Sequence, residues 1–211
     1  MSPSDRPPSN ADNGDALEKL NLHGLSTADY LKVEPVLSVA QKSALATRLA
    51  SGLHAQGSSE DESANAEAIL RVLVWNGEPS VIESMAQAAA ENPNTPRSIA
   101  WALANDDEAA AAPILKASLA LSDVDLVAIV EATENPSKMI AIARRDAVST
   151  ELSRSLAKCG DEETVHVLLG NANAEIPEDA YESMLDRHGK TERIQAGIIG
   201  REAISSAVAT R

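Results

Sequence analysis

The 211 residues of this chain can bury one core of ordinary size, and with 2% aromatic residues and no Phe that core must be filled by small and aliphatic side chains. The formal net charge of −14 disfavours binding to nucleic-acid phosphates or to anionic membrane surfaces. The single cysteine, Cys159, excludes an internal disulfide framework and a cysteine-clustered iron–sulfur or metal site within one chain. We therefore expect no metal, no other cofactor and no nucleic-acid partner.

Neither a membrane span nor a secretion signal is evident in the sequence. No apolar run approaches the roughly 18 residues that a spanning helix needs. The N-terminal stretch MSPSDRPPSNADNGD lacks the charged-then-apolar order of a signal peptide. These observations predict a cytoplasmic protein that does not insert into a membrane. Residues 1–16 offer almost nothing to bury, so we expect a disordered tail there and a single helical domain over 17–211.

Two helical runs are predicted between residues 37 and 75. The first, LSVAQKSALATRLASGL, starts at a capping Ser38 and has leucines four residues apart. The polar break HAQGSSEDES separates it from NAEAILRVLVW, which ends in Trp75 before the turn signal NGEPS. Trp75 is expected to be partly exposed, and an exposed tryptophan is a frequent interface anchor. Trp101, in a later helix between Ile99 and Leu103, is expected in the core.

From residue 80 to residue 188, positions typical of helix starts recur every 27 residues in two interleaved series. The series are Thr95, Ser122, Ser149 and Ile176, and Ser80, Asp107, Glu134, Asp161 and His188. Apolar columns follow the same register: Leu103, Val130, Ala157 and Met184, and Leu115, Ile142 and Leu169. Two short helices per unit of this length are typical of stacked helical repeats, in which each unit buries its apolar stripe against the next.

The period therefore predicts an all-α fold, a right-handed α-solenoid of two-helix repeats. The alternative is an irregular helical bundle whose loops are evenly spaced by chance. After residue 188 the pattern breaks at Gly197 and Gly200, and residues 189–211 are predicted to form helices that cap the last repeat.

Two stretches of the repeat region resemble a bacterial family called domain of unknown function 2336. They are LANDDEAAAAPILKASLALSDVDLVAIVE, from Leu103 to Glu131, and AIARRDAVSTELSRSLAKCGDEETVHVLLGN, from Ala141 to Asn171. The NPNTP at residues 92–96 is also similar to leucine-rich-repeat-variant units. The resemblance extends over roughly residues 37–187 and implies HEAT-like helical repeats. It implies no activity, because none is assigned to the family.

Catalytic chemistry is not indicated by any spacing in the sequence. Cys159 and His166 are separated by about 10 Å if both lie on one helix, which is too far for direct proton transfer. The four histidines have no metal-ligand spacing. The acid pairs fall at predicted helix starts, where they cap free N–H groups. The sequence thus predicts a protein that is not an enzyme and has neither catalytic nor metal-binding residues.

A basic island interrupts the acidic background between Ser137 and Cys159, with five bases against two acids. The bases are Lys138, Arg144, Arg145, Arg154 and Lys158. Two interpretations of Arg144 and Arg145 stay open. They form an ion-pair ladder to acids of neighbouring repeats, or they dock an acidic or phosphorylated partner, with Lys138 and Arg154 assisting.

These patterns predict a non-catalytic scaffold or adaptor that mediates protein–protein interaction through Arg144, Arg145, Lys138, Arg154 and Trp75. Its partner would be another protein or a second copy of the chain. The alternative is a ligand-responsive regulator or an enzyme that binds a small anionic or phosphorylated ligand around Arg144 and Arg145.

Overall fold

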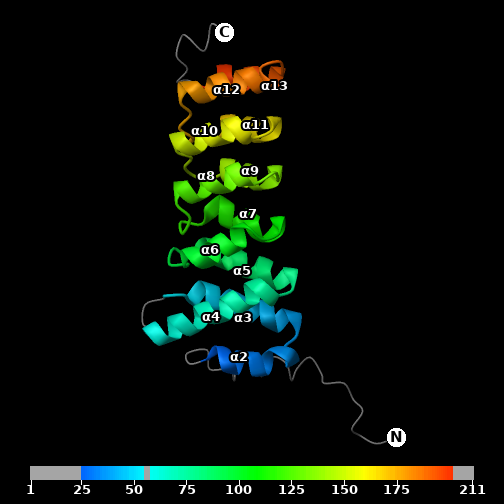
Figure 1. Cartoon of the computed structure of the whole chain (residues 1–211), viewed down its shortest axis with the longest axis vertical. Helices are drawn as coiled ribbons and strands as arrows, with labels where there is room; N and C mark the ends of the chain where they lie inside the picture. The colour runs from blue at the N-terminus through cyan, green and yellow to red at the C-terminus, as the bar shows by residue number, and fades with distance from the viewer. Residues whose placement is uncertain (1–24, 55–57, 202–211) are drawn as a thin grey trace, which may run out of the picture.

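The computed structural model describes residues 25–54 and 58–201, and this part of the chain contains helices and no strand, which confirms the predicted all-α class (Figure 1). The predicted N-terminal tail lies outside the described residues, as do the last ten residues of the predicted C-terminal cap. None of the described helices is both long enough and apolar enough to cross a membrane.

The N-terminal part folds into four α-helices and one short 3-10 helix. They are α2 (Thr27–Val33), η2 (Glu34–Val36), α3 (Val39–Gly52), α4 (Glu60–Asn76) and α5 (Pro79–Glu91). The predicted start of α3 is confirmed, because the Ser38 side chain accepts a hydrogen bond from the Gln41 amide in a capping box. Ser59 and Glu62 form the same arrangement at the start of α4.

The remaining helices come in consecutive pairs joined by short loops. The pairs are α6 (Arg97–Ala104) with α7 (Glu108–Ala117), α8 (Asp123–Ala132) with α9 (Pro136–Ala143), α10 (Thr150–Cys159) with α11 (Glu162–Gly170), and α12 (Glu178–His188) with α13 (Glu192–Ile199).

Most of the predicted helix starts lie within one or two residues of the observed ones. Ser122, Ser149 and Asp161 each cap a helix with a side-chain hydrogen bond to the backbone. Asn135, one residue after the position that the period indicates, caps α9. The predicted start at His188 is wrong: α12 continues to His188 and ends at Gly189, so the next helix begins only at Glu192.

The helices stack in layers along the long axis of the molecule, with the chain ascending from α2 to α13 (Figure 1). Each of the helices α3, α5, α7, α9 and α11 packs against the odd-numbered helix that follows it. On the other side of the stack, α8 packs against α10 and α10 against α12. Both predicted apolar columns, the one that begins at Leu103 and the one that begins at Leu115, are buried in the core. Successive pairs therefore supply one another's hydrophobic contacts.

Candidate functional site

Two residues of the basic island, Lys138 and Arg145, are directed into the stack. The ammonium group of Lys138 donates to the carbonyl oxygens of Ala104 at 3.1 Å and Asp106 at 2.8 Å, at the end of α6. Arg145 donates through Nη1 to the carbonyl of Leu115 at 2.7 Å and through Nη2 to that of Ser118 at 2.8 Å. Both cations thus satisfy carbonyls that helix ends leave free, at the negative end of the helix dipole.

Burial affects both of these side chains. Removal from water lowers the pKa of Arg145, although the nearby carboxylates of Asp123 and Asp146 oppose this effect. Burial likewise lowers the pKa of Lys138, and Asp106 and Asp107 oppose it. A guanidinium remains charged at any physiological pH, so Arg145 is a permanent cation bound to the C-terminal end of α7.

The contact made by Arg145 recurs along the stack. In each case a side chain donates to the backbone carbonyls at the end of an earlier helix, and we call this contact a carbonyl clamp. Asn92 donates to the carbonyls of Ala50 and Leu53, and Asn171 to those of Ala143 and Arg145. Two further arginines do the same: Arg187 with Ala157 and Gly160, and Arg201 with Leu169, Asn171 and Ala174. Arg145 therefore belongs to a structural series.

Arg154 makes ion pairs of the kind that the ladder interpretation describes. Its Nε lies 2.7 Å from a carboxylate oxygen of Asp179 in the next pair of helices, and its Nη1 lies 2.6 Å from Glu151 on its own helix. The hydrogen bond to Asp179 is the main reason why the pKa of Arg154 is raised. Exposed pairs of this kind add little to stability, because water and salt screen them.

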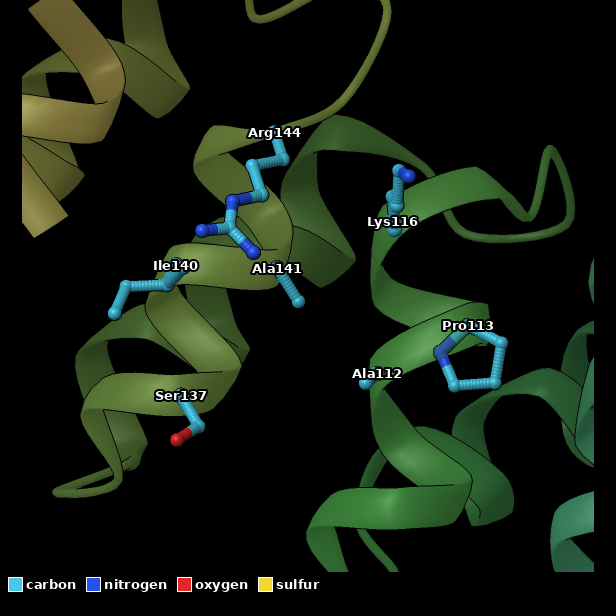
Figure 2. A pocket seen from close by; sticks show the side chains of 7 residues that line it. All are labelled: Ala112, Pro113, Lys116, Ser137, Ile140, Ala141 and Arg144. Carbon is cyan, nitrogen blue, oxygen red and sulfur yellow. The ribbon is translucent and has the colours of Figure 1, made fainter.

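Arg144 differs from its neighbours because its side chain is exposed and makes no hydrogen bond or ion pair with any residue that the structure describes. It follows the last residue of α9 and lines a groove between α9 and α7, with its guanidinium lying over α9 near Ile140 and Ala141 (Figure 2). Lys116, in the last turn of α7, is exposed and equally without a partner among the described residues. Two cations from different helix pairs thus lie at the same end of this groove.

The groove encloses about 410 Å³ and is lined by seven residues of the two helices. Those on α7 are Ala112, Pro113 and Lys116, and those at α9 are Ser137, Ile140, Ala141 and Arg144. The methyl groups of Ala112 and Ala141 point into the gap between the helices, while Ser137 lies at the end opposite Arg144 and Lys116 (Figure 2). The small size of these two side chains leaves the space open. The site combines an apolar floor with a cationic end.

The two tryptophans lie elsewhere, near the N-terminal half of the stack. Trp75 is 81% exposed at the end of α4, which packs against α2, α3, α5 and α6, so the structure does not bring it to the groove. The predicted core position of Trp101 is wrong: its side chain is 36% exposed, and the Arg97 guanidinium lies 5.6 Å above the ring. This cation–π contact allows the indole to remain at the surface.

Cys159 does not line the groove. Cys159 is partly buried and packs against the hydrophobic core at the end of α10. Within residues 25–54 and 58–201, no three His, Cys, Asp or Glu side chains are grouped so that they could hold a metal ion.

Comparison with known families gives a match to the C-terminal part of the chain. Residues 110–211 match a family described as "Uncharacterised protein conserved in bacteria (DUF2336)". The matched segment begins within α7 and takes in both walls of the groove. Searches of curated proteins and of solved structures gave no match.

Proposed function

We propose that this protein, whose residues 110–211 match the uncharacterised bacterial family DUF2336, is a non-catalytic helical-repeat scaffold. It would bind another protein through the groove between α7 and α9. The family description assigns no activity. The proposal therefore rests on the surface of this molecule and on the chemistry of the side chains that line the groove.

We infer further that the helix pairs are repeats of about 27 residues in a right-handed α-solenoid. The helices that open successive pairs begin at Arg97, Asp123, Thr150 and Glu178, which supports this inference. The carbonyl clamps support it as well, because Arg145 and Arg187 each reach carbonyls 30 and 27 residues earlier in the chain. Such contacts repeat only if each unit stacks in a similar way on the one before.

The observation that carries the proposed function is the pair of cations left without partners at the groove. Arg97, Arg154 and Arg193 each pair with a carboxylate of another helix. Arg144 and Lys116 instead remain exposed beside an apolar floor, although the chain carries a net charge of −14. A surface of mixed apolar and cationic character suits an interface whose core is apolar and whose edge is polar.

The same geometry favours a protein partner over a small phosphorylated ligand held by Arg144 and Arg145. The guanidinium of Arg145 is occupied by the carbonyls of Leu115 and Ser118, so the two arginines do not converge on one anion. The groove floor would contribute nothing to a free phosphate, whereas it can bury apolar atoms of a peptide. A cytoplasmic location, and an interface role for Trp75, remain predictions.

Photo-crosslinking in living cells tests the proposed function. A photoreactive amino acid at Ser137, inside the groove, should give a discrete crosslinked protein that disappears when Arg144→Glu is added. The same amino acid at Val124, which is exposed on α8 outside the groove, provides the matched control. If Ser137 gives no crosslink, or the same products as Val124, the groove is not a protein-binding site.

A further inference from the structure

We propose that the partner segment bound by the groove is acidic: a carboxylate of an Asp or Glu side chain lies between Arg144 and Lys116, and a neighbouring apolar side chain lies on the floor formed by Ala112, Ala141 and Ile140. This inference rests on the proposed function, because it names the chemistry of the peptide that the groove takes.

The positive charge at the groove favours a partner segment with a negative charge. Both cations are exposed and free of partners among the described residues, and they belong to helices of two different repeats. A planar guanidinium can donate two parallel hydrogen bonds to a carboxylate, and an ammonium group adds a second positive charge on the other side.

The length of the groove determines how many residues of the partner segment can lie in it. Ser137 and Arg144 are seven residues apart at the two ends of α9, which corresponds to about 10 Å along a helix. An extended peptide covers this length with about three residues, at roughly 3.3 Å each. The acidic residue would therefore lie within about three residues of the position that faces Ser137, whose hydroxyl can donate to or accept from the peptide backbone.

The floor of the groove favours a peptide over a bare anion. A volume of about 410 Å³ is far more than one carboxylate fills, and it falls in the range of roughly 300–1,000 Å³ that is typical of ligand pockets. The floor consists of apolar atoms of Ala112, Ala141 and Ile140. Covering these atoms lowers the free energy only if the group that covers them is apolar too. An acidic residue next to an apolar residue uses both parts of the site.

Selection from a phage-displayed library of short random peptides on the full-length protein tests this inference. We expect the enriched peptides to carry Asp or Glu within about three residues of an apolar side chain, as the length of the groove requires. For the best peptide, made with a fluorescent label, replacing the acid with its amide should weaken binding about tenfold, which corresponds to the loss of hydrogen bonds to a charged group.

Variants of the protein locate the bound peptide. Arg144→Gln and Lys116→Gln should each weaken binding about fivefold to tenfold, whereas Lys158→Gln, an exposed cation on α10 outside the groove, should leave it unchanged. Because both groove cations are exposed and unpaired among the described residues, these variants should unfold at the wild-type temperature. Ile140→Ser should weaken binding without changing the preference for the acid over the amide.

The outcomes separate this inference from the proposed function. Enriched peptides without an acid, or peptides whose binding is insensitive to Arg144→Gln but sensitive to Ile140→Ser, would overturn the acidic preference and leave the groove as a protein-binding site. A phosphoserine peptide that binds where its glutamate counterpart does not would equally overturn it. If no peptide is enriched and Ser137 gives no crosslink, both the inference and the proposed function fail.

Discussion

Arg97 on α6 and Asp125 on α8 form a two-pronged ion pair between consecutive helix pairs, with Arg97 Nε donating to one carboxylate oxygen at 2.9 Å and Nη2 donating to the other. The same carboxylate accepts hydrogen bonds from the amide and the hydroxyl of Ser122, at 3.0 and 2.8 Å, and so completes the capping box of α8. Asp125 is only 3% exposed. One buried acid thus both starts a helix and joins that helix to the one before it.

Replacing this acid should destabilise the protein. Asp125→Ala removes the charge-assisted bonds to Arg97 and the reciprocal half of the capping box, and we expect a loss of about 2–3 kcal/mol in the free energy of unfolding. Asp123→Ala, at an exposed position of the same helix, should change it by about 0.5 kcal/mol or less. Urea-induced unfolding followed by circular dichroism measures both, and equal effects of the two substitutions would contradict the role assigned to Asp125.

The stability should also depend on pH through Asp125. The hydrogen bonds from Arg97, together with those from Ser122, hold the pKa of this carboxyl well below its usual range. The folded form therefore prefers the ionised carboxylate, and its contribution is complete above the unfolded pKa of about 3.9 and is lost as the pH falls towards the folded value.

We accordingly expect the wild-type protein to lose more free energy of unfolding than Asp125→Asn when the pH is lowered from about 5 to about 2. Urea titrations at a series of pH values give the difference. Parallel curves for the two proteins over this interval would show that Asp125 is not held ionised by Arg97.

Arg144 and Arg145 should behave differently although they are adjacent. Arg145→Gln leaves the carbonyls of Leu115 and Ser118 without their charged donor, so the free energy of unfolding should fall by about 2 kcal/mol. Arg144→Gln should alter it by about 0.5 kcal/mol or less, because its exposed side chain bonds no described residue. Thermal unfolding of the two variants side by side makes the comparison, and a loss of stability for Arg144→Gln alone would reverse the roles.

These two arginines also mark the limit of what the sequence predicts. The capping residues and the apolar columns could be predicted from the sequence, because a helix cap and a buried helix face each have a characteristic residue spacing. The acceptors of Arg145 could not be predicted from the sequence, because they are backbone carbonyls. Every residue has such a carbonyl, so the residue type does not show which one is bound. Lys116 lies outside the basic island in the sequence, and it lines the same groove as Arg144 only because α7 and α9 pack against each other.

The spacing of donors and acceptors along the chain is a further signal that the sequence contains. Arg145 and Arg187 lie 27 and 30 residues after their acceptors, so a cation one period beyond a helix end is the signal that could have identified the carbonyl clamps. The same shift of one unit, here 28 residues, relates Lys116 to Arg144. Side chains that converge on one site in stacked helix pairs are separated in the sequence by about the length of one pair, whereas the basic island covers only 23 consecutive residues.

The carbonyl clamps require a donor, and Asn171 allows this to be tested with almost no change in shape. Its amide nitrogen donates to the carbonyls of Ala143 at 2.9 Å and Arg145 at 2.8 Å. Asn171→Asp replaces that donor with a carboxylate oxygen that faces two carbonyls, and we expect a loss of about 2 kcal/mol or more. Asn173→Asp, at an exposed position nearby, is the control. If both substitutions had the same small effect on urea-induced unfolding, the clamp would contribute nothing to stability.

The last helix should stabilise the end of the stack. α13 packs against α11 and α12, and on it Ile194 is fully buried whereas Ile199 is 79% exposed. Ile194→Ala should lower the free energy of unfolding by about 3 kcal/mol, because it opens a cavity beside the last apolar layer, and Ile199→Ala should lower it by less than about 0.5 kcal/mol. The two substitutions remove the same atoms from one helix, so urea-induced unfolding isolates the effect of burial. If Ile194→Ala were as stable as Ile199→Ala, α13 would not cap the stack, and the predicted capping role of residues 189–211 would fail for the part that the structure describes.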